Sequence, residues 1–428
     1  MPAAARFDVV VAGGGTAGVA AACSAADLGA RTLLLEAAPG LGGNATQALV
    51  HTFCGLYLPA DTGAPQFANP GFPRRFAEAL ARAGGAGAVE RAGRVHVLPV
   101  FPPVVERFAA EVCARRTALT TWTGALLVAA RVDTGGAILE VDRSDGRREI
   151  EAALVVDASG DGGASALAGA ELALAAPSEL QCASYILRLE GVAPDAAQGF
   201  KRLQLTAAVA GAAHRGELPA GCESVLVRPG AAAGEVYLTL NVPRPAAGLD
   251  PLDPERVRAL EAEARASATR LLAHLRQTQP AFAAARLLAW PRRLGLREGR
   301  RVVGAAVVSR EDVLSGRRRA DEVCLSSWPI ELWSDHRRAR FEHPAGPSSV
   351  PLGALTSRSH PRLAMAGRCL SADHEALGAL RVIGTALATG EAAGVAAALA
   401  ADARSDLRAL SPERVRRAIL GLAERSPA

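Results

Sequence analysis

The feature that most constrains this chain is a valine-rich run that leads directly into three spaced glycines. Residues 8–12 are typical of a fully buried parallel strand. Gly13, Gly15 and Gly18 then fill a G-x-G-x-x-G frame. Such glycines allow a tight turn, a close approach of backbone to a pyrophosphate, and close packing of the next helix on the strand. The segment therefore predicts a strand, a loop and a helix that together bind a dinucleotide.

An acidic residue stands at the distance that this interpretation requires. A helix is expected over residues 17–28, because the stretch is mostly alanine and stops at Gly29. A second strand, residues 32–35, ends on Glu36, which follows Gly18 by 18 residues and is placed to bind a ribose hydroxyl. An ordinary glycine-rich turn is the alternative, and it leaves Glu36 unexplained.

A second glycine pair indicates which dinucleotide is bound. Gly42 and Gly43 follow shortly after the acid, and a nicotinamide enzyme has no need of them. In flavoproteins of the glutathione-reductase type, a pair at this place brings backbone close to the flavin end of FAD. The stretch resembles an FAD site more than an NAD site, so FAD is the expected cofactor.

The overall composition narrows the range of partners. A chain of 428 residues, half of them apolar, suggests two interleaved domains with a large core. The net charge is +5, but the basic residues are arginines apart from Lys201 and form no long stripe, so nucleic-acid binding is not expected. We expect a small-molecule substrate, and the oligomeric state stays open.

The cysteines and the first 35 residues indicate the cellular compartment in which the protein is expected. The seven cysteines are scattered and form no C-x-x-C pair, so we expect reduced thiols and no metal site. Residues 1–6 are too short for a signal peptide, and residues 9–35 are broken by glycine and charge. We therefore expect a cytoplasmic protein without a membrane span.

The segment after the second glycine pair is irregular and then helical. His51, Cys54 and Tyr57 lie in a loop that either passes near the flavin ring or simply joins elements. Residues 72–84 and 102–117 have apolar residues at helical spacing. These helices interrupt the first dinucleotide-binding unit.

Three strands are expected next, over residues 124–132, 137–142 and 149–156. The last strand leads into Asp157-Ala158-Ser159-Gly160-Asp161, which resembles the segment with which flavoproteins containing two dinucleotide folds return to the FAD pyrophosphate. Turn or helix-cap carboxylates are the alternative for the two aspartates.

Residues 175–285 show a different sequence pattern, with strands expected over 182–189 and 235–242 and a long amphipathic helix over 255–277.

The last third of the chain carries the most specific motif. The segment over residues 362–385 contains Gly367-Arg368, Ser371-Ala372, His374 and Arg381-Val382, and an alanine-rich helix over 386–401 follows. This pattern resembles the C-terminal signature of the FAD-dependent oxidoreductase family related to fumarate reductase. Residues 296–304 and 312–317 resemble two further blocks of that family, so the resemblance covers residues 6–50, 150–170 and 290–402.

The resemblance implies an α/β fold in which a Rossmann-like FAD-binding domain, a parallel sheet with a β-meander, carries an inserted α+β substrate domain. The expected division is residues 1–174 and 286–402 for the FAD-binding domain, with a helical insertion at about 60–117, residues 175–285 for the substrate domain, and residues 403–428 for a C-terminal helix or tail. The residues expected to bind FAD are Gly13, Gly15, Thr16, Ala17, Gly18, Glu36, Ala37, Gly42, Gly43, Thr46, Ala158, Gly160, Asp161, Gly367, Arg368, Ala379 and Val382.

The chain departs from the family at two places. After Trp328-Pro329-Ile330 the family commonly has D-x-H, whereas this chain has Glu331-Leu332-Trp333. Some relatives bind flavin covalently through a histidine just after the glycine pair, where this chain has Asn44-Ala45. We therefore expect FAD to be held without a covalent bond.

The expected function is an FAD-dependent oxidoreductase that transfers a hydride between flavin N5 and a small organic substrate. His374 is expected to handle a proton or to bind the substrate, because its ordinary pKa is close to neutral. Arg381 is expected to bind flavin oxygens or a substrate carboxylate, and Arg297 to anchor an acidic group.

Two other functions stay open. A flavin-dependent monooxygenase or halogenase shares the glycine-rich start, but halogenases rely on an active-site lysine and a W-x-W-x-I-P segment, and Lys201 lies outside any such segment. A non-catalytic or tRNA-directed flavoprotein would need a basic face with aromatic residues for base stacking. The chain has only three tyrosines.

Overall fold

A mostly parallel sheet forms the centre of the computed structural model, which describes residues 5–60 and 62–425. The strand order is β6-β2-β1-β9-β8-β7, and β20 pairs with the end of β9. Its strands are β1 Ala5–Ala12, β2 Thr32–Glu36, β6 Leu119–Thr123, β7 Leu126–Val132, β8 Ala137–Arg143, β9 Gly146–Asp157 and β20 Leu363–Met365. The first four and last three residues of the expected domains lie outside the described residues.

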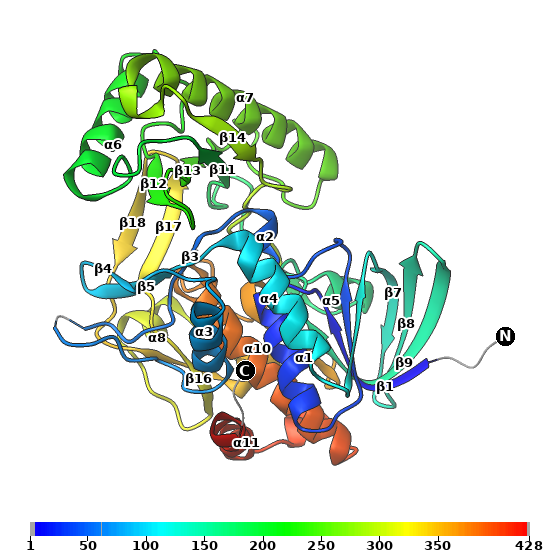
Figure 1. The fold of residues 1–428 in the computed structure, drawn as a ribbon. Helices are drawn as coiled ribbons and strands as arrows, with labels where there is room; N and C mark the ends of the chain where they lie inside the picture. The colour runs from blue at the N-terminus through cyan, green and yellow to red at the C-terminus, as the bar shows by residue number, and fades with distance from the viewer. Residues whose placement is uncertain (1–4, 61, 426–428) are drawn as a thin grey trace.

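Pairing directions divide this sheet into two parts. Strands β6, β2, β1, β9 and β20 run parallel, whereas β7, β8 and β9 form an antiparallel meander at one edge (Figure 1). The predicted fold class, a Rossmann-like sheet with a β-meander, is therefore confirmed. Strand β6 was not predicted, because its Leu-Thr-Thr-Trp-Thr sequence has no long apolar run.

Two helices of small residues pack against each other beside the sheet. Helix α1, Thr16–Asp27, begins at the glycine loop, and α10, Ile383–Asp402, comes from the end of the chain (Figure 1). A Cβ atom on Gly390 would meet the Ala17 carbonyl oxygen at 2.1 Å, and one on Gly394 would meet that of Ala21 at 2.1 Å. Both glycines are therefore needed for this close approach.

Helix α10 is almost entirely apolar, and most of its residues are buried inside the protein. By length and composition it could cross a membrane, but 89% of its most apolar stretch is buried inside the protein. It packs on α1, the sheet, α3 Phe72–Arg82 and α11 Pro412–Arg425. A helix with this pattern is the core helix of a large domain.

A separate α+β unit lies above the body of the molecule (Figure 1). Its sheet has the order β12-β13-β11-β14 and packs with two helices around its own hydrophobic core. Its elements are β11 Ser184–Glu190, α6 Gly199–His214, β12 Leu226–Pro229, β13 Val236–Asn241, α7 Pro254–Thr278, η1 Pro280–Phe282 and β14 Arg286–Ala289. Strand β14 pairs with β11, so this sheet continues past the predicted end at residue 285.

The predicted insertion at about 60–117 is only partly helical. Helices α3 and α4, Pro102–Ala114, are present, and two strands between them join a strand from before α3 in a three-stranded antiparallel sheet that the sequence pattern did not predict. The strands of this small sheet are β3 Thr52–Phe53, β4 Glu90–Ala92 and β5 Val95–Pro99.

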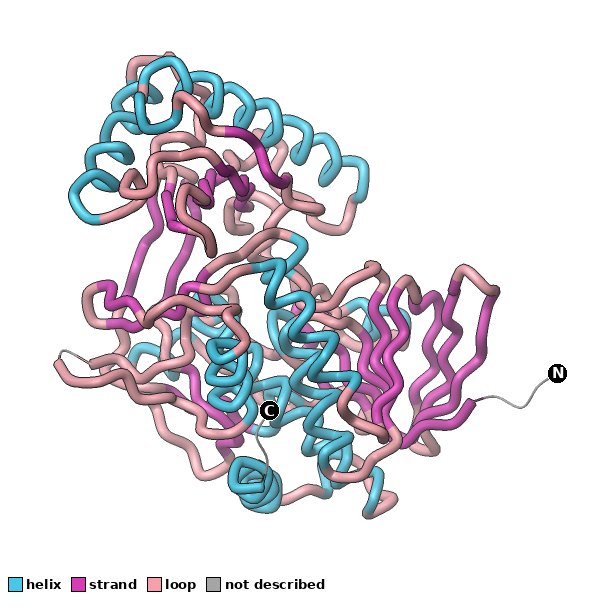
Figure 2. The backbone as a smooth tube through the Cα atoms, in the orientation of Figure 1, coloured by secondary structure: helices cyan, strands magenta, loops and turns pink. Residues whose placement is uncertain are grey.

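Short elements complete the chain, and Figure 2 shows how loops join them to the longer helices and strands. These elements are α2 Asn44–Gln47, α5 Gly163–Leu167, β10 Leu172–Ala173, β15 Arg301–Val302, α8 Arg310–Leu314, β16 Glu322–Ser326, β17 Ile330–Asp335, β18 Arg338–Glu342, β19 Ser348–Pro351, η2 Leu352–Leu355, η3 Gly367–Cys369, α9 Leu377–Leu380 and η4 Leu407–Ala409. Strands β17 and β18 form a hairpin that reaches from the body toward the upper unit (Figure 1).

Candidate functional site

Two glycines of the loop after β1, Gly13 and Gly18, have no room for a side chain. Gly13 has φ of +105°, and a Cβ there would meet the Ala158 carbonyl oxygen at 2.5 Å. A Cβ on Gly18 would meet the Gly13 carbonyl oxygen at 1.7 Å. A Cβ on Gly15 would meet no such neighbour, because the nearest atom to it, the Gly43 Cα, would lie at 3.8 Å. The first turn of α1 is thus exposed to the adjoining cavity, and a helix N-terminus attracts phosphate.

Glu36 lies at the end of β2 and faces this loop. Its Oε2 accepts a hydrogen bond from the Gly14 amide at 2.7 Å, and its Oε1 accepts one from Ala38 at 2.8 Å. The side chain also lines the cavity. Because a carboxylate offers about four acceptor positions, Glu36 can hold the loop and still accept a ribose hydroxyl.

The second glycine pair lies against the first glycine loop. The Gly42 amide donates to the Gly14 carbonyl at 2.8 Å, and a Cβ on Gly43 would meet the Gly15 Cα at 2.8 Å. Thr46 does not face the cavity, since its buried hydroxyl donates to the Leu41 carbonyl at 2.7 Å. The threonine therefore closes the loop.

The segment after β9 is fixed by an arginine from the end of the chain. Arg368 Nε donates to the Gly160 carbonyl at 2.9 Å, and its Nη2 bonds Asp161 Oδ1 at 2.8 Å. Asp157 is fully buried and accepts from Ser159 and Ser165, which makes it a turn carboxylate, the alternative considered above.

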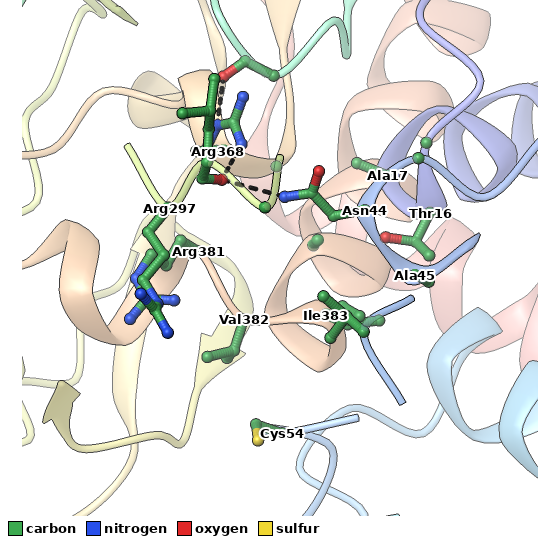
Figure 3. Close-up of a pocket in the computed structure, with 18 of the residues that line it drawn as sticks. Thr16, Ala17, Asn44, Ala45, Cys54, Arg297, Arg368, Arg381, Val382 and Ile383 are labelled. Atoms are coloured by element: carbon green, nitrogen blue, oxygen red, sulfur yellow. Dashed lines mark hydrogen bonds between the residues drawn. The ribbon is translucent and has the colours of Figure 1, made fainter. Parts of the chain in front are cut away.

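These segments line one cavity of about 710 Å³. The N-terminal end of α10 closes another part of it, with Val382, Ile383 and Ala386 in the wall (Figure 3). The α10 N-cap, Val382, has no side-chain hydrogen bond. In the first turn the Gly384 amide donates to the Cys54 carbonyl at 2.8 Å, whereas the Ile383 and Thr385 amides have no hydrogen-bond partner among the described residues and are available to an anion or to a ring oxygen.

Most of the residues predicted to bind FAD line this cavity, and five do not. Gly18 packs under the loop, Gly42 and Thr46 bond within it, Asp161 holds Arg368, and Ala379 is buried in α9. Those in the lining are Gly13, Gly15, Thr16, Ala17, Glu36, Ala37, Gly43, Ala158, Gly160, Gly367, Arg368 and Val382.

A charged cluster forms the opposite wall. Glu331 Oε2 accepts from Trp328 Nε1 at 2.8 Å, and Oε1 accepts from Trp333 Nε1 at 2.6 Å. Arg381 Nη2 lies 3.7 Å from Glu331 Oε1, and the Arg297 guanidinium lies 4.6 Å from the centre of the Trp333 ring. Figure 3 shows the side chains of Arg297 and Arg381 close together, across the cavity from Thr16 and Ala17.

Burial and neighbouring charges set the protonation of this cluster. Burial disfavours the ionised form of Glu331, but Arg381, Trp333 and Trp328 outweigh this effect and hold its pKa below the usual value. Burial, together with the Arg381 guanidinium, lowers the pKa of Arg297 to about 9. With one carboxylate between two guanidiniums, this wall carries a net positive charge.

His374 does not belong to the cavity wall. Its Nδ1 lies 2.8 Å from Oε1 of Glu298, a fully buried carboxylate that also bonds Arg301 at 2.6 Å. The hydrogen bond with Glu298 raises the pKa of His374. His374 therefore belongs to a buried ion-pair cluster with Glu298 and Arg301. Arg368 and Arg381, from the same sequence motif, line the cavity.

The inserted sheet supplies lining residues that sequence reasoning missed. Ile186 of β11 lies opposite Thr239 of β13, and both line the cavity beside Ser184. The alternation of these strands could have indicated such a face, but not that it meets the cofactor domain. His51 and Cys54 of the irregular loop also line the cavity, whereas Tyr57 packs against Phe67.

A comparison with known protein families supports the interpretation of the glycine loop as part of an FAD site. The model of a protein family described as FAD dependent oxidoreductase matches residues 8–419. No curated protein matches the sequence.

Two solved structures illustrate the structural similarity. A geranylgeranyl bacteriochlorophyll reductase-like protein from Thermoplasma acidophilum is 15% identical, with a TM-score of 0.48 over 99% of this chain and 89% of that chain. The p-nitrophenol 4-monooxygenase PnpA from Pseudomonas putida DLL-E4 is 14% identical, with a TM-score of 0.49 over 99% of this chain and 87% of that one.

Proposed function

The chain belongs to the FAD-dependent oxidoreductase family, and from this premise we propose that it transfers a hydride between FAD and a small organic molecule bound in the same cavity. The observation that carries the proposal is that one cavity of about 710 Å³ joins the dinucleotide-binding loop to a charged wall of arginine, glutamate and tryptophan. We base the closer relation to fumarate reductase flavoproteins on the motifs around Gly367 and Leu296.

The residues of the cavity fit FAD. Gly15 and Gly43 leave backbone surface where a pyrophosphate can approach, and Glu36 can accept ribose hydroxyls. The α10 N-terminus faces the part of the cavity that lies beside the charged wall. When bound, FAD supplies a two-electron acceptor or donor at its N5 atom.

The charged wall favours an anionic substrate. Arg297 and Arg381 both line the cavity, and Glu331 neutralises only one of the two guanidiniums. A guanidinium binds a carboxylate through two parallel hydrogen bonds, which orient as well as hold it. We therefore assign Arg297 and Arg381 to the binding of an acidic group on the substrate.

The single lysine argues against a halogenase. Lys201 lies on α6 of the upper unit, where its ammonium group pairs with Asp195, and its side chain is 61% exposed. It is not among the residues that line the cavity. Hydride transfer with a small organic molecule therefore fits the cavity better than chlorination does.

The experiment that tests this function starts from purified protein loaded with FAD. We expect flavin absorbance that is bleached anaerobically by at least one member of a panel of hydroxy acids, amino acids and alcohols. Arg297→Gln and Arg381→Gln should keep the flavin and require a higher concentration of an acidic reductant. Absence of flavin absorbance after FAD is added would refute the proposal, and NADPH-driven hydroxylation would replace it with a monooxygenase.

A further inference from the structure

His51 is held in the cavity wall in one defined orientation. The residue is 7% exposed, and its ring stacks on Tyr237 with a centroid distance of 4.8 Å and an interplanar angle of 11°. Its Nδ1 lies 3.1 Å from the Leu49 carbonyl oxygen. Within the described part of the chain no group is hydrogen-bonded to Nε2, and this nitrogen is not sealed in the interior.

This arrangement selects one tautomer of the imidazole. A carbonyl oxygen can only accept a hydrogen bond, so Nδ1 must carry the hydrogen. In the neutral ring, Nε2 then presents its lone pair, and His51 is one of the residues that line the cavity. Tyr237 covers one face of the ring.

The backbone that orients His51 is strained. Leu49 has φ of +55°, a left-handed conformation that among the described non-glycine residues is shared only by Arg404. Such a conformation costs about 1–3 kcal/mol and persists only where surrounding packing fixes it. Leu49 is 7% exposed and packs in one cluster with Ile186 and Tyr237, so the strand residues behind His51 hold the strained turn.

The groups that face the imidazole keep it neutral. Burial lowers the pKa of His51 to about 4, the Leu49 carbonyl opposes this change, and the charge of Arg228 adds to it. Arg228 reaches this region from β12 and bonds Glu90 of β4, while Tyr237 faces the ring from β13. A neutral imidazole at pH 7 can accept a proton, whereas an imidazolium cannot.

We propose that His51 Nε2 accepts the proton of a substrate hydroxyl or amine while the neighbouring carbon is oxidised. The O–H or N–H bond breaks and its proton forms an N–H bond with Nε2. The adjacent C–H bond breaks and its hydride passes to the two-electron acceptor that the proposed function supplies, which leaves a C=O or C=N bond. The inference rests on the proposed function for this acceptor, and it assigns the proton to a residue other than His374.

The first test needs no substrate. The FAD-loaded enzyme labelled with 15N in its histidine rings is titrated by NMR, and the His51 signals are identified by their loss in His51→Gln. We expect a neutral ring with hydrogen on Nδ1 from pH 5.5 to pH 8. An Nε2–H tautomer, or a ring protonated at pH 7, would overturn the proposal even if the flavin is bound and active.

The second test measures the proton-transfer step itself. His51→Gln should bind FAD with an unchanged spectrum, and its anaerobic reduction by the fastest compound of the panel should be slowed by about 10²–10⁴-fold. The matched control is His274→Gln on α7, outside the cavity, which should react at the wild-type rate. A wild-type rate in His51→Gln would refute the assignment. If no compound reduces the flavin, the proposed function fails, and the NMR titration alone decides the state of His51.

Discussion

Gly15 differs from the other glycines of the loop, because it has room for a side chain within the protein but not beside a cofactor. A Cβ there would stand 3.8 Å from its nearest neighbour, whereas Gly13 and Gly18 would clash with backbone. We expect Gly15→Ala to fold normally and to bind FAD about thirtyfold more weakly, a loss of about 2 kcal/mol. Fluorescence titration of apoprotein with FAD measures the change.

Gly346→Ala is the matched control for this variant, because nothing lies within 4 Å of a Cβ at that position and the residue is outside the cavity. The control should bind FAD as the wild type does. Equal affinity of Gly15→Ala and wild type would show that the pyrophosphate does not pass over this glycine.

Glu331 stabilises the two arginines of the charged wall. It is partly buried, at 16% exposure, and lies 3.7 Å from Arg381. We expect Glu331→Gln to lower the free energy of unfolding by about 3 kcal/mol, because two guanidiniums then remain without a counter-ion. Urea unfolding measures this loss.

The charge explanation has its own control. Adding Arg381→Gln to Glu331→Gln removes one of the unbalanced charges, so the double variant should be more stable than Glu331→Gln alone. If the second substitution lowers stability further by its full separate effect, the two residues are not coupled through charge.

At the scale of elements, the contact between α1 and α10 depends on glycine. Gly390→Ala would place a methyl group 2.1 Å from the Ala17 carbonyl oxygen and force the helices apart. We expect a loss of at least about 2 kcal/mol in stability together with weaker FAD binding, because both helices begin at the cavity. Thermal unfolding with and without FAD measures both effects.

The matched control for Gly390→Ala is Gly421→Ala in α11, where nothing lies within 4 Å of the added Cβ. Alanine favours a helix over glycine by about 1 kcal/mol, so this variant should be as stable as the wild type or more stable. A comparable loss in both variants would mean that the close helix contact is not the cause.

Helix α10 also carries a buried carboxyl group that makes stability depend on pH. Glu391 is 2% exposed and accepts a hydrogen bond from the Phe72 amide at 2.7 Å. Burial raises its pKa from 4.5 to about 7. The folded protein therefore binds more protons than the unfolded chain between these values, so this contribution to stability is complete below pH 4.5 and is lost as the pH rises through 7.

The loss from this one group amounts to about 3 kcal/mol, at about 1.4 kcal/mol for each pH unit of the shift. Glu391→Gln keeps an acceptor for the Phe72 amide but does not titrate. We expect the variant to gain stability relative to the wild type between pH 5 and pH 8, as measured by urea unfolding. An unchanged difference between the two proteins across this range would contradict the assignment.

The elements that the sequence predicted are those with a clear local pattern. The alanine-rich α1 and the amphipathic α7 are confirmed within one residue at each predicted start and end. Strands β4 and β14 were missed because they are short and largely exposed, so no run of apolar residues indicates them. Their place in a sheet depends on partners that lie far away in the sequence.

At the scale of the whole molecule, sequence motifs indicated the glycine loop and the two arginines of the opposite wall, but not the tryptophans and strand residues of that wall. Gly13 and Glu36 lie within a single local motif whose spacing has a physical meaning. Trp328 and Trp333 come from the start of a hairpin, and Ile186 from the inserted sheet, so their position at the cavity depends on tertiary packing. His374 shows the opposite case, since a strong local motif does not determine which side chains of the segment face the cavity.

FAD binding should therefore stabilise distant parts of the chain together. We expect added FAD to slow hydrogen exchange at residues 13–17, 36–45 and 382–386, three segments that contribute residues to the cavity lining, and to leave the middle of α7 unchanged. Mass spectrometry of peptides from the exchanged protein measures this. Protection confined to the glycine loop would show that the cavity does not act as one binding site.

The packing of α1 on α10 also has a consequence for synthesis on the ribosome. The first helix leaves the exit tunnel long before its partner has been translated, because more than 350 residues separate Asp27 from Ile383. Until then its apolar surface has no cover, and a nascent chain of this kind is exposed to misassembly. Completion of the fold must therefore wait until α10 has been translated and has left the tunnel, and fragments that stop before residue 383 should require chaperones to remain dispersed.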